Sequence, residues 1–340
     1  MDSVKKFSGY FILAFFLIFL AFIFYFVDEI YIERAVVEKV EFRIEKGETL
    51  SSVINRLEDL GLVRNPSLAK AYIYFSGLKG SVKPGSYSIG PKYSVRGIFE
   101  SFIMGSDVEI MIFEGWTSKD IALALKEKGV IENSDEFLRM AKNFNAPEGR
   151  YKFLSHSSGV DLEGYLFPDT YKFERGSAVS ALETLLNNFN KKVYLRYGKS
   201  PEELRNVLVM ASMLEKEVQS VQDMRLVSGI LWKRFESEAP LQVDAALVYV
   251  KCVLMVDTDK VDSSCRELSS ADKNLDSFYN TYLYKGLPPG PISNPGLRAI
   301  EAAFNPVENQ YWYYLSARDD GRTIFSRTLD EHNMNRVIYR

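Results

Sequence analysis

Two glutamates near the middle of the chain have the chemistry of an acid–base catalyst. They lie in Ala211–Glu217, which reads Ala-Ser-Met-Leu-Glu-Lys-Glu, within a run of helical periodicity. On a helix, the later glutamate has Met213, Leu214 and Val221 three and four residues away. A carboxyl group held against apolar surface keeps its proton and can act as a general acid near neutral pH. Glu217 is therefore the first candidate for a catalytic acid.

The earlier glutamate has a more mixed setting and is the second candidate. On the same helix, Glu215 looks back at Ala211 and Ser212 and forward to Val218 and Gln219. From the residues alone, a buried structural acid bonded to a neighbouring loop is an equally open interpretation of Glu217, because structural pairs also perturb pKa values.

The composition excludes several classes of function. The formal net charge is −3 and no cluster of Lys or Arg stands out, so no nucleic-acid partner is expected. The chain has only two histidines, His156 and His332, which are far apart in sequence. A zinc site of the usual His/Cys kind is therefore not expected, and we predict no metal and no cofactor. Hydrophobic residues make up 46% of the chain, which fits a folded protein with a membrane segment.

An apolar segment near the N-terminus predicts a membrane anchor. Residues 7–27 carry no charge, and a helix of this length spans a bilayer. Lys5 and Lys6 precede it and Asp28 follows it, so the positive-inside rule places the N-terminus in the cytoplasm and the rest of the chain outside. A cleaved signal peptide is the alternative. We favour the uncleaved anchor because no small residues follow the apolar run.

The two cysteines, Cys252 and Cys265, fall on the extracytoplasmic side of this topology, where disulfides persist. A bridge would close a short loop around Val256–Asp259, which has the composition of a turn. Two free thiols are equally compatible with the sequence, since it does not give the separation of the Cα atoms.

A repeat with an offset of 68 residues follows the apolar segment. It pairs Gly47 with Gly115, Gly61 with Gly129, and Asn65 with Asn133. Each copy reads as a strand, a glycine turn with a Thr cap, an amphipathic helix and a glycine stop. This unit resembles a LysM-like module, the small fold that binds the glycan backbone of the cell wall. For the second copy, we favour a packing unit without a ligand.

The C-terminal half has a different character. Residues 177–197, 201–216 and 222–237 read as helices, and residues 312–315 and 323–325 as strands. Helices and strands do not alternate regularly, so we predict an α+β fold.

Five segments of this half together resemble the YceG-like family, and the likeness extends over nearly the whole chain. They are residues 162–171 (LEGYLFPDTY), 211–217 (ASMLEKE), 241–244 (LQVD), 280–296 (NTYLYKGLPPGPISNPG) and 325–333 (FSRTLDEHN). The sequence departs from the family pattern at Val243–Ala246, at Lys233 and at Phe278, which puts the detailed contacts around Asp244 in doubt.

The resemblance implies an enzyme that cleaves peptidoglycan within its glycan strands, between N-acetylmuramic acid and N-acetylglucosamine. The cleavage is non-hydrolytic and leaves a 1,6-anhydro end. The family's catalytic acid corresponds to Glu217, with Glu215 as the back-up acid. An ordinary glycosidase needs two carboxylates, whereas here the sugar's own 6-hydroxyl is the nucleophile, so one carboxyl can act first as acid and then as base.

The same resemblance suggests side chains that contact the sugar. The predicted substrate-binding residues are Tyr165, Asp169, Gln242, Asp244, Asn280, Tyr282 and Asn294. Turn formation is the simpler explanation for Asp169, and a strand-end cap for Gln242 and Asp244.

These inferences predict a single-pass protein of the cell inner membrane whose partners are the membrane, peptidoglycan glycan strands and the peptidoglycan synthases (penicillin-binding proteins). Two other functions stay open: a non-catalytic wall-binding anchor, and a muramidase that uses Asp169 or Asp244 as a second carboxylate. The predicted parts are a cytoplasmic tail (1–6), a transmembrane helix (7–27), a linker (28–38), a LysM-like module (39–107) and a mixed α/β YceG-like catalytic domain (108–340).

Overall fold

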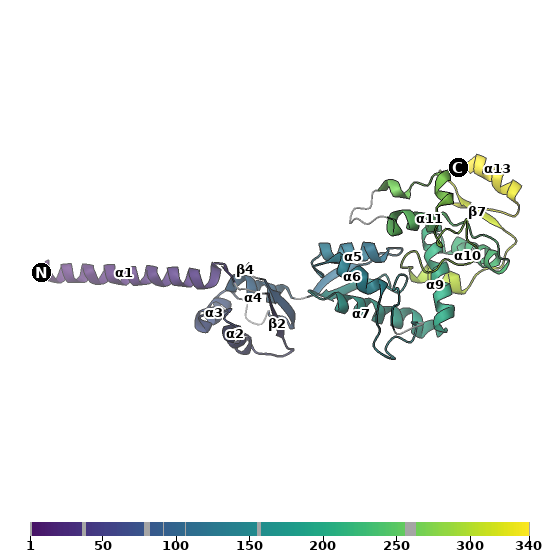
Figure 1. Ribbon diagram of the computed structural model, residues 1–340. Helices are drawn as coiled ribbons and strands as arrows, with labels where there is room; N and C mark the ends of the chain where they lie inside the picture. Colours follow the sequence, from purple (N-terminus) through teal and green to yellow (C-terminus); the bar gives the residue numbers. More distant parts are fainter. Residues whose placement is uncertain are drawn as a thin grey trace. The chain divides into compact units, whose positions relative to one another are not determined.

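The computed structural model of the chain (Figure 1) describes residues 2–35, 39–77, 82–90, 92–105, 107–154, 158–255 and 263–339. The chain divides into two compact units: Met1–Val108 with Phe173–Gly176, and Glu109–Lys172 with Ser177–Arg340. Within the described ranges, helices combine with two-stranded sheets in the orders β1–β4, β2–β3, β5–β6 and β7–β8, which is the mixed helix and strand content expected of an α+β chain. The predicted turn around residues 256–259 lies outside the described residues.

The N-terminal helix α1 (Asp2–Tyr31) contains the predicted apolar span and continues beyond it. Its stretch Leu13–Tyr31 has a mean hydropathy of 2.3 and is long and apolar enough to cross a membrane, by length and composition only. The helix runs through residues predicted as linker because Glu29 and Ile30 are buried against the rest of the first unit.

The remainder of the first unit is a small module of strands and helices. The pair β2–β3 is antiparallel, with Phe42 opposite Tyr87, and both side chains enter the core with Phe99 and Phe102. The elements are β1 (Arg34–Ala35), β2 (Val40–Ile44), α2 (Leu50–Asp59), α3 (Pro66–Phe75), β3 (Gly85–Ile89), β4 (Lys92–Tyr93) and α4 (Val95–Met104).

Helix α3 was missed by sequence reasoning, although its start carries a clear signal. Asn65 accepts a hydrogen bond from the Leu68 N–H at 3.1 Å, and Pro66 occupies the first helical position. An Asn cap followed by Pro is a common way for a helix to begin.

The predicted repeat is visible in the local structure of both copies. Thr49 caps α2 and Thr117 caps α5 (Ser118–Glu127), each accepting a hydrogen bond from the N–H three residues later. Gly61 and Gly129 follow these helices with φ of 69° and 68°, a left-handed conformation that favours glycine. The matching caps and stops confirm that the two segments use the same local design.

The larger unit comprises Glu109–Lys172 and Ser177–Arg340. The first two residues of β5 and the segment from Phe173 to Gly176 belong to the first unit. The remaining elements of the larger unit are β5 (Asp107–Met111), α6 (Ser134–Lys142), β6 (Thr170–Glu174), α7 (Ala178–Phe189), η1 (Asn190–Tyr194), α8 (Leu195–Tyr197), α9 (Pro201–Glu217), α10 (Val221–Glu236), α11 (Asp244–Tyr249), η2 (Val250–Leu254), η3 (Ser263–Arg266), η4 (Ser270–Asn274), α12 (Leu297–Phe304), β7 (Tyr313–Ser316), β8 (Thr323–Ser326) and α13 (Leu329–Tyr339). The predicted strands near 312–315 and 323–325 are β7 and β8, which pair antiparallel.

Helix α9 forms the centre of this unit. It begins with Pro201 after a capping box between Ser200 and Glu203, and it buries every residue from Leu208 to Leu214. It packs against α10, α11 and α12. Because it is apolar on all sides over two turns, its position is fixed by surrounding helices, and so is the end that carries the two candidate acids.

Candidate active site

Glu217 is the last residue of α9, at the point where the chain leaves the helix. Val218 has extended backbone angles (φ −140°, ψ 135°), and Val221 already belongs to α10. The predicted helical neighbour relation between Glu217 and Val221 is therefore wrong, because the helix ends before it could form. Met213 and Leu214 are buried as predicted.

Glu217 lines a cavity of about 370 Å³. Its Oε1 accepts a hydrogen bond from the Ala245 N–H at 3.0 Å, in the first turn of α11. This contact fixes one carboxyl oxygen while the side chain still lines the cavity. The lining also includes Thr117, Lys119, Asp120, Lys216, Asp244, Val248, Tyr249, Arg266 and Ile292.

Asp244 is the other predicted site residue that lines this cavity. Its Oδ1 accepts a hydrogen bond from the Tyr282 hydroxyl at 2.5 Å. The residues before Asp244 are also hydrogen-bonded to the residue before Tyr282. The Gln242 N–H donates to the Thr281 carbonyl, and the Val243 N–H donates to the Thr281 hydroxyl. The segments 241–244 and 280–282, which the sequence grouped by resemblance, are thus adjacent.

Tyr314 is a site residue that sequence reasoning missed. Burial raises its pKa well above the ordinary value, and the charges of Glu217 and Asp244 raise it further, while Arg234 acts in the opposite direction. The Tyr314 hydroxyl therefore stays protonated. The sequence placed Tyr314 on a strand, β7, but no motif pointed to the cavity.

Glu215 has a different environment from the one predicted. Its Oε2 accepts a hydrogen bond from the Gly296 N–H at 2.8 Å, at the start of α12. Burial raises the pKa of this carboxyl, and the Gly296 hydrogen bond only partly offsets the effect. The covering of Glu215 by the loop that precedes α12 is a contact that its helical neighbours could not predict.

Asn294 is fully buried and joins three segments of the chain. Its Oδ1 accepts hydrogen bonds from the Gly164 and Leu166 N–H groups, both at 2.9 Å. Its Nδ2 donates to the Trp116 carbonyl at 3.0 Å and to Glu163 Oε1 at 2.8 Å. With both ends of the amide occupied by protein, this side chain holds the loop that follows Gly286 against the loop around Gly164.

The other predicted substrate contacts lie apart from the Glu217 cavity. Asn280 is buried and donates to the Lys273 and Leu275 carbonyls. The Gln242 side chain is exposed, on a backbone with φ of 55°. Desolvation raises the pKa of Asp169, but the hydrogen bond from Asn188 and the charge of Lys192 outweigh it and lower the pKa overall.

Tyr165 lines a second cavity. It is buried, which raises its pKa to about 12, and it shares the cavity wall with Asp161, Glu163, Tyr279 and Pro291. Whether a sugar reaches this side chain stays a prediction.

Glu163 makes the stability of the fold depend on pH. Burial raises its pKa from 4.5 to about 8, and the Asp161 charge adds to this, while the Ser118 N–H acts in the opposite direction. Since the pKa is higher in the folded state, the protonated acid favours folding, and its contribution is full below pH 4.5 and lost as the pH rises through about 8. We expect the free energy of unfolding to fall by several kcal/mol over this interval.

The check is to measure chemical denaturation across that pH range in the wild type and in Glu163→Gln. The glutamine keeps an oxygen that can accept from Ser118 and Asn294 but carries no charge. We expect the free energy of unfolding of this variant to fall much less with rising pH than that of the wild type. If it falls as much as in the wild type, other groups cause the pH dependence.

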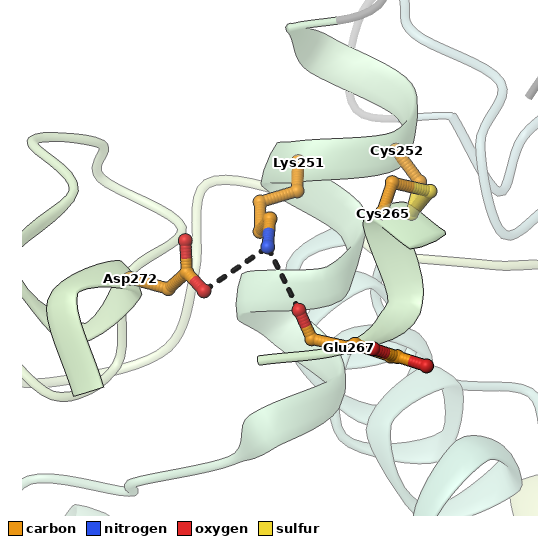
Figure 2. Close-up of a disulfide and its surroundings, with 5 residues drawn as sticks. All are labelled: Lys251, Cys252, Cys265, Glu267 and Asp272. Carbon is orange, nitrogen blue, oxygen red and sulfur yellow. Dashed lines mark hydrogen bonds and ion pairs between the residues drawn. A yellow bond between two sulfur atoms is a disulfide. The ribbon is translucent and has the colours of Figure 1, made fainter. Parts of the chain in front are cut away.

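A disulfide joins one of the residues that line the Glu217 cavity, Cys252, to a second cysteine. Cys252 of η2 is bonded to Cys265 of η3, with Cα atoms 5.4 Å apart (Figure 2). Beside it, Lys251 Nζ donates to the Glu267 carbonyl at 2.9 Å and lies 3.0 Å from Asp272 Oδ2. The bridge resolves the alternative that the sequence left open, and it carries the neighbouring Arg266 to the cavity.

Removing this bridge is expected to destabilise the larger unit. The cysteines are 13 residues apart, and a loop of this size corresponds to about 2–3 kcal/mol of unfolding free energy. We expect a Cys252→Ser, Cys265→Ser double variant to unfold at a correspondingly lower concentration of denaturant. The matched control is reductant, which should lower the unfolding midpoint of the wild type to that of the variant and leave the midpoint of the variant unchanged. A wild type indifferent to reductant would contradict the pairing.

Comparisons with known proteins agree on one family. The endolytic murein transglycosylase of Bacillus subtilis (strain 168) is 26% identical over 316 residues, which cover 88% of this chain and 84% of that protein. The protein of the same name from Streptococcus pneumoniae (strain R6) is 26% identical over 318 residues, and the alignment covers 86% of this chain but only 57% of the streptococcal protein.

A solved structure supports the fold. The crystal structure of a YceG-like protein from Listeria monocytogenes aligns with a TM-score of 0.52 and 27% identity, covering 87% of this chain and 99% of that one. The model of the YceG-like family matches residues 42–337. This chain therefore belongs to the YceG-like family.

Proposed function

We propose that this chain is an endolytic murein transglycosylase and that Glu217 is its catalytic acid. The observation that carries the proposal is the position of Glu217, which closes the central helix α9 and lines a cavity with one carboxyl oxygen already fixed by the Ala245 N–H. The relatives that bear this enzyme name align with most of the chain, which supports the same activity here.

The proposed reaction needs one carboxyl group in two roles. Glu217 donates its proton to O4 of the leaving N-acetylglucosamine while the bond from C1 of N-acetylmuramic acid breaks. The resulting carboxylate then takes the proton of the 6-hydroxyl of the same muramic acid as O6 bonds to C1. The products are a free 4-hydroxyl and a 1,6-anhydro end, and no water is consumed. Acid–base catalysis of this kind contributes about 10²–10⁴-fold to a rate.

The groups around Glu217 suit such a reaction. Burial and the charges of Glu217 and Asp244 raise the pKa of Tyr314, so its hydroxyl stays protonated. Asp244 is engaged by the Tyr282 hydroxyl. An intramolecular nucleophile also has a proximity advantage over water.

Hydrolysis is the second candidate function, because Asp244 lines the same cavity as Glu217. In that reaction, Asp244 would activate a water molecule or attack C1, as the second carboxylate of a muramidase does. The Tyr282 hydroxyl already occupies one oxygen of Asp244, and the relatives that align with most of this chain are named transglycosylases. We therefore favour the transglycosylase.

The proposal includes the location of the enzyme in the cell and its orientation in the membrane. Residues 7–27 would cross the cell inner membrane once, with the N-terminus in the cytoplasm and the residues that follow the span outside. The strand and helix module of residues 39–107 would be the LysM-like part that holds glycan, and residues 108–340 the catalytic domain. A cleft anchored in this way suits newly made strands, and the peptidoglycan synthases are then natural partners.

Digestion of purified sacculi tests the activity. The full-length protein in detergent should release soluble glycan fragments of many lengths, because an endolytic enzyme cuts within strands. Release of disaccharides from the strand ends alone would overturn the endolytic assignment. Binding to sacculi without any released product would instead support the non-catalytic wall anchor.

A further inference from the structure

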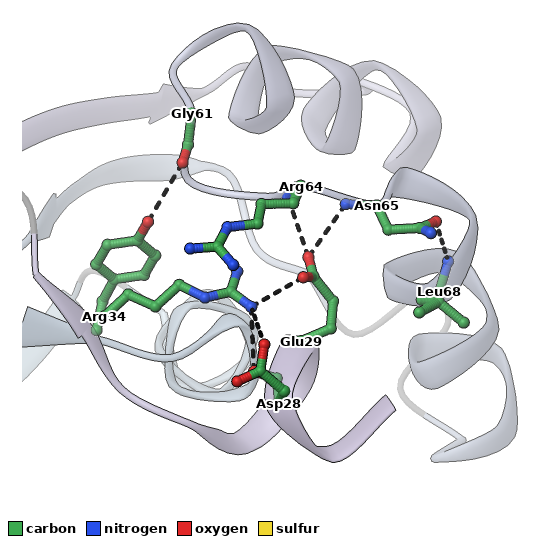
Figure 3. Close-up of polar contacts among 8 residues, drawn as sticks. Asp28, Glu29, Arg34, Gly61, Arg64, Asn65 and Leu68 are labelled. Carbon is green, nitrogen blue, oxygen red and sulfur yellow. Dashed lines mark hydrogen bonds and ion pairs between the residues drawn. The ribbon is translucent and has the colours of Figure 1, made fainter. Parts of the chain in front are cut away.

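The C-terminal end of α1 packs against the module of strands and helices, β1 to α4, that forms the rest of the first unit. Figure 3 shows that Glu29 Oε1 accepts hydrogen bonds from the Arg64 and Asn65 N–H groups, at 3.0 and 3.1 Å. The other carboxyl oxygen lies 2.8 Å from Arg34 Nη2. Ile30 is fully buried in the module's core. Separating the helix from the module would break these hydrogen bonds and expose Ile30 to water, so the two are held together.

This attachment begins within the apolar span itself. Phe26 packs against the same core as Ile30. The uncharged run ends at Val27, and Ile30 lies about 4.5 Å further along the helix axis, at 1.5 Å per residue. The headgroup layer on each side of the hydrocarbon is roughly 5–7 Å thick. If α1 crosses the membrane, the core of the module therefore starts inside the headgroup layer.

Helices α3 and α4 of the module both contact α1, and α3 does so beside its C-terminal end. The rings of Tyr72 and Tyr31 are 6.0 Å apart, and Figure 1 shows α3 on the side of the module from which α1 enters. The last turn of α3 carries two neighbouring aromatic side chains, Tyr74 and Phe75, which are 64% and 85% exposed. Aromatic side chains concentrate at the headgroup level of membrane proteins, where one end of the ring is apolar and the other is wet.

The charges at this end of α1 are compatible with contact to phospholipid. Arg34 lies 3.6 Å from the Asp28 carboxylate and 2.8 Å from that of Glu29. One arginine thus partly neutralises the acidic pair that follows the span, which reduces its repulsion from lipid phosphates.

We propose that α3 rests in the outer headgroup layer of the bilayer, with Tyr74 and Phe75 inserted at the boundary between headgroups and acyl chains. The proposal depends on the membrane span proposed above. The occupant is lipid because the patch continues from a membrane-crossing helix that is rigidly joined to it. The consequence is that the module is fixed against the bilayer surface and does not extend into the wall on a free tether.

Fluorescence quenching in vesicles tests this contact. The full-length protein is reconstituted into phosphatidylcholine vesicles that carry a nitroxide on the headgroup or lack it, and Phe75→Trp and Tyr74→Trp are compared with the wild type. The wild-type signal of Trp116, Trp232 and Trp312 is subtracted. Because both positions are exposed, neither substitution disturbs the core.

The matched control is Arg43→Trp. The Arg43 side chain is 72% exposed and lies on β2, which is away from α1 in Figure 1. We expect the added fluorescence of Phe75→Trp and Tyr74→Trp to lose most of its intensity in nitroxide vesicles, and that of Arg43→Trp to be retained. Equal quenching at all three positions, or none at Phe75 and Tyr74, would overturn the inference.

Flotation separates this inference from the anchor on which it rests. Protein that floats with the vesicles while the new tryptophans remain unquenched rules out the headgroup contact but leaves the anchor intact. Protein that fails to float with the vesicles overturns the span, and the headgroup contact with it. The sacculus digest in detergent is independent of both results.

Discussion

Glu217→Gln is expected to lower the rate of glycan cleavage by about 10²–10⁴-fold, because the amide can neither donate the proton to O4 nor accept the one from the 6-hydroxyl. The substitution keeps the shape of the side chain and an oxygen that can accept from the Ala245 N–H, a contact of 3.0 Å in the wild type. The fold should therefore be preserved, and the loss should appear in kcat. The measurement is the rate of fragment release from sacculi, with thermal unfolding as the check on folding.

The matched control is Glu215→Gln, two residues earlier on the same helix. Glu215 Oε2 accepts from the Gly296 N–H, and a glutamine oxygen can do the same. We expect this variant to retain most of the activity. If Glu215→Gln is inactive and Glu217→Gln is active, the roles of the two acids are reversed. Full activity in both variants would show that neither acid of α9 is the catalytic acid.

Asn294→Ala is expected to destabilise the larger unit by roughly 2–6 kcal/mol, since each buried polar group left without a partner costs about 1–3 kcal/mol. The groups left without a partner are the N–H groups of Gly164 and Leu166, whereas Glu163 keeps the hydrogen bond from the Ser118 N–H. This loss is a large share of the stability of an ordinary domain. Chemical denaturation of the purified variant measures it.

Asn305→Ala is the matched control for this prediction. The Asn305 side chain donates to the Glu301 carbonyl at an exposed site, so its removal should change stability by no more than about 0.5 kcal/mol. If Asn294→Ala unfolds like the wild type but no longer binds glycan, Asn294 is a sugar contact, as the sequence suggested, and not a structural brace.

Much of the fold could be predicted from local sequence signals. The ends of α9 and α10, the caps at Thr49 and Thr117 and the pair of strands at the C-terminus follow from helix and strand patterns that depend on nearby residues alone. The position of Glu217 in a cavity also agrees with the motif that singled it out.

Long-range contacts could not be predicted in this way. The covering of Glu215 by Gly296 and the electrostatic effect of Glu217 on Tyr314 involve residues that are distant along the chain. The two cysteines are only 13 residues apart, but their pairing depends on a Cα separation that the sequence does not give. Asn294 shows a similar limit, because a polar side chain in a distinctive loop has the same sequence signal whether it binds a sugar or two other segments of its own chain.

The most direct test of the central proposal is to digest purified glycan strands in water enriched in oxygen-18 and to weigh the products by mass spectrometry. In the proposed reaction, O6 of the sugar attacks C1, so the muramic ends should carry no heavy oxygen and be lighter by one water than reducing ends. Reducing ends that carry oxygen-18 would contradict this account and identify Glu217 as one half of a hydrolytic pair.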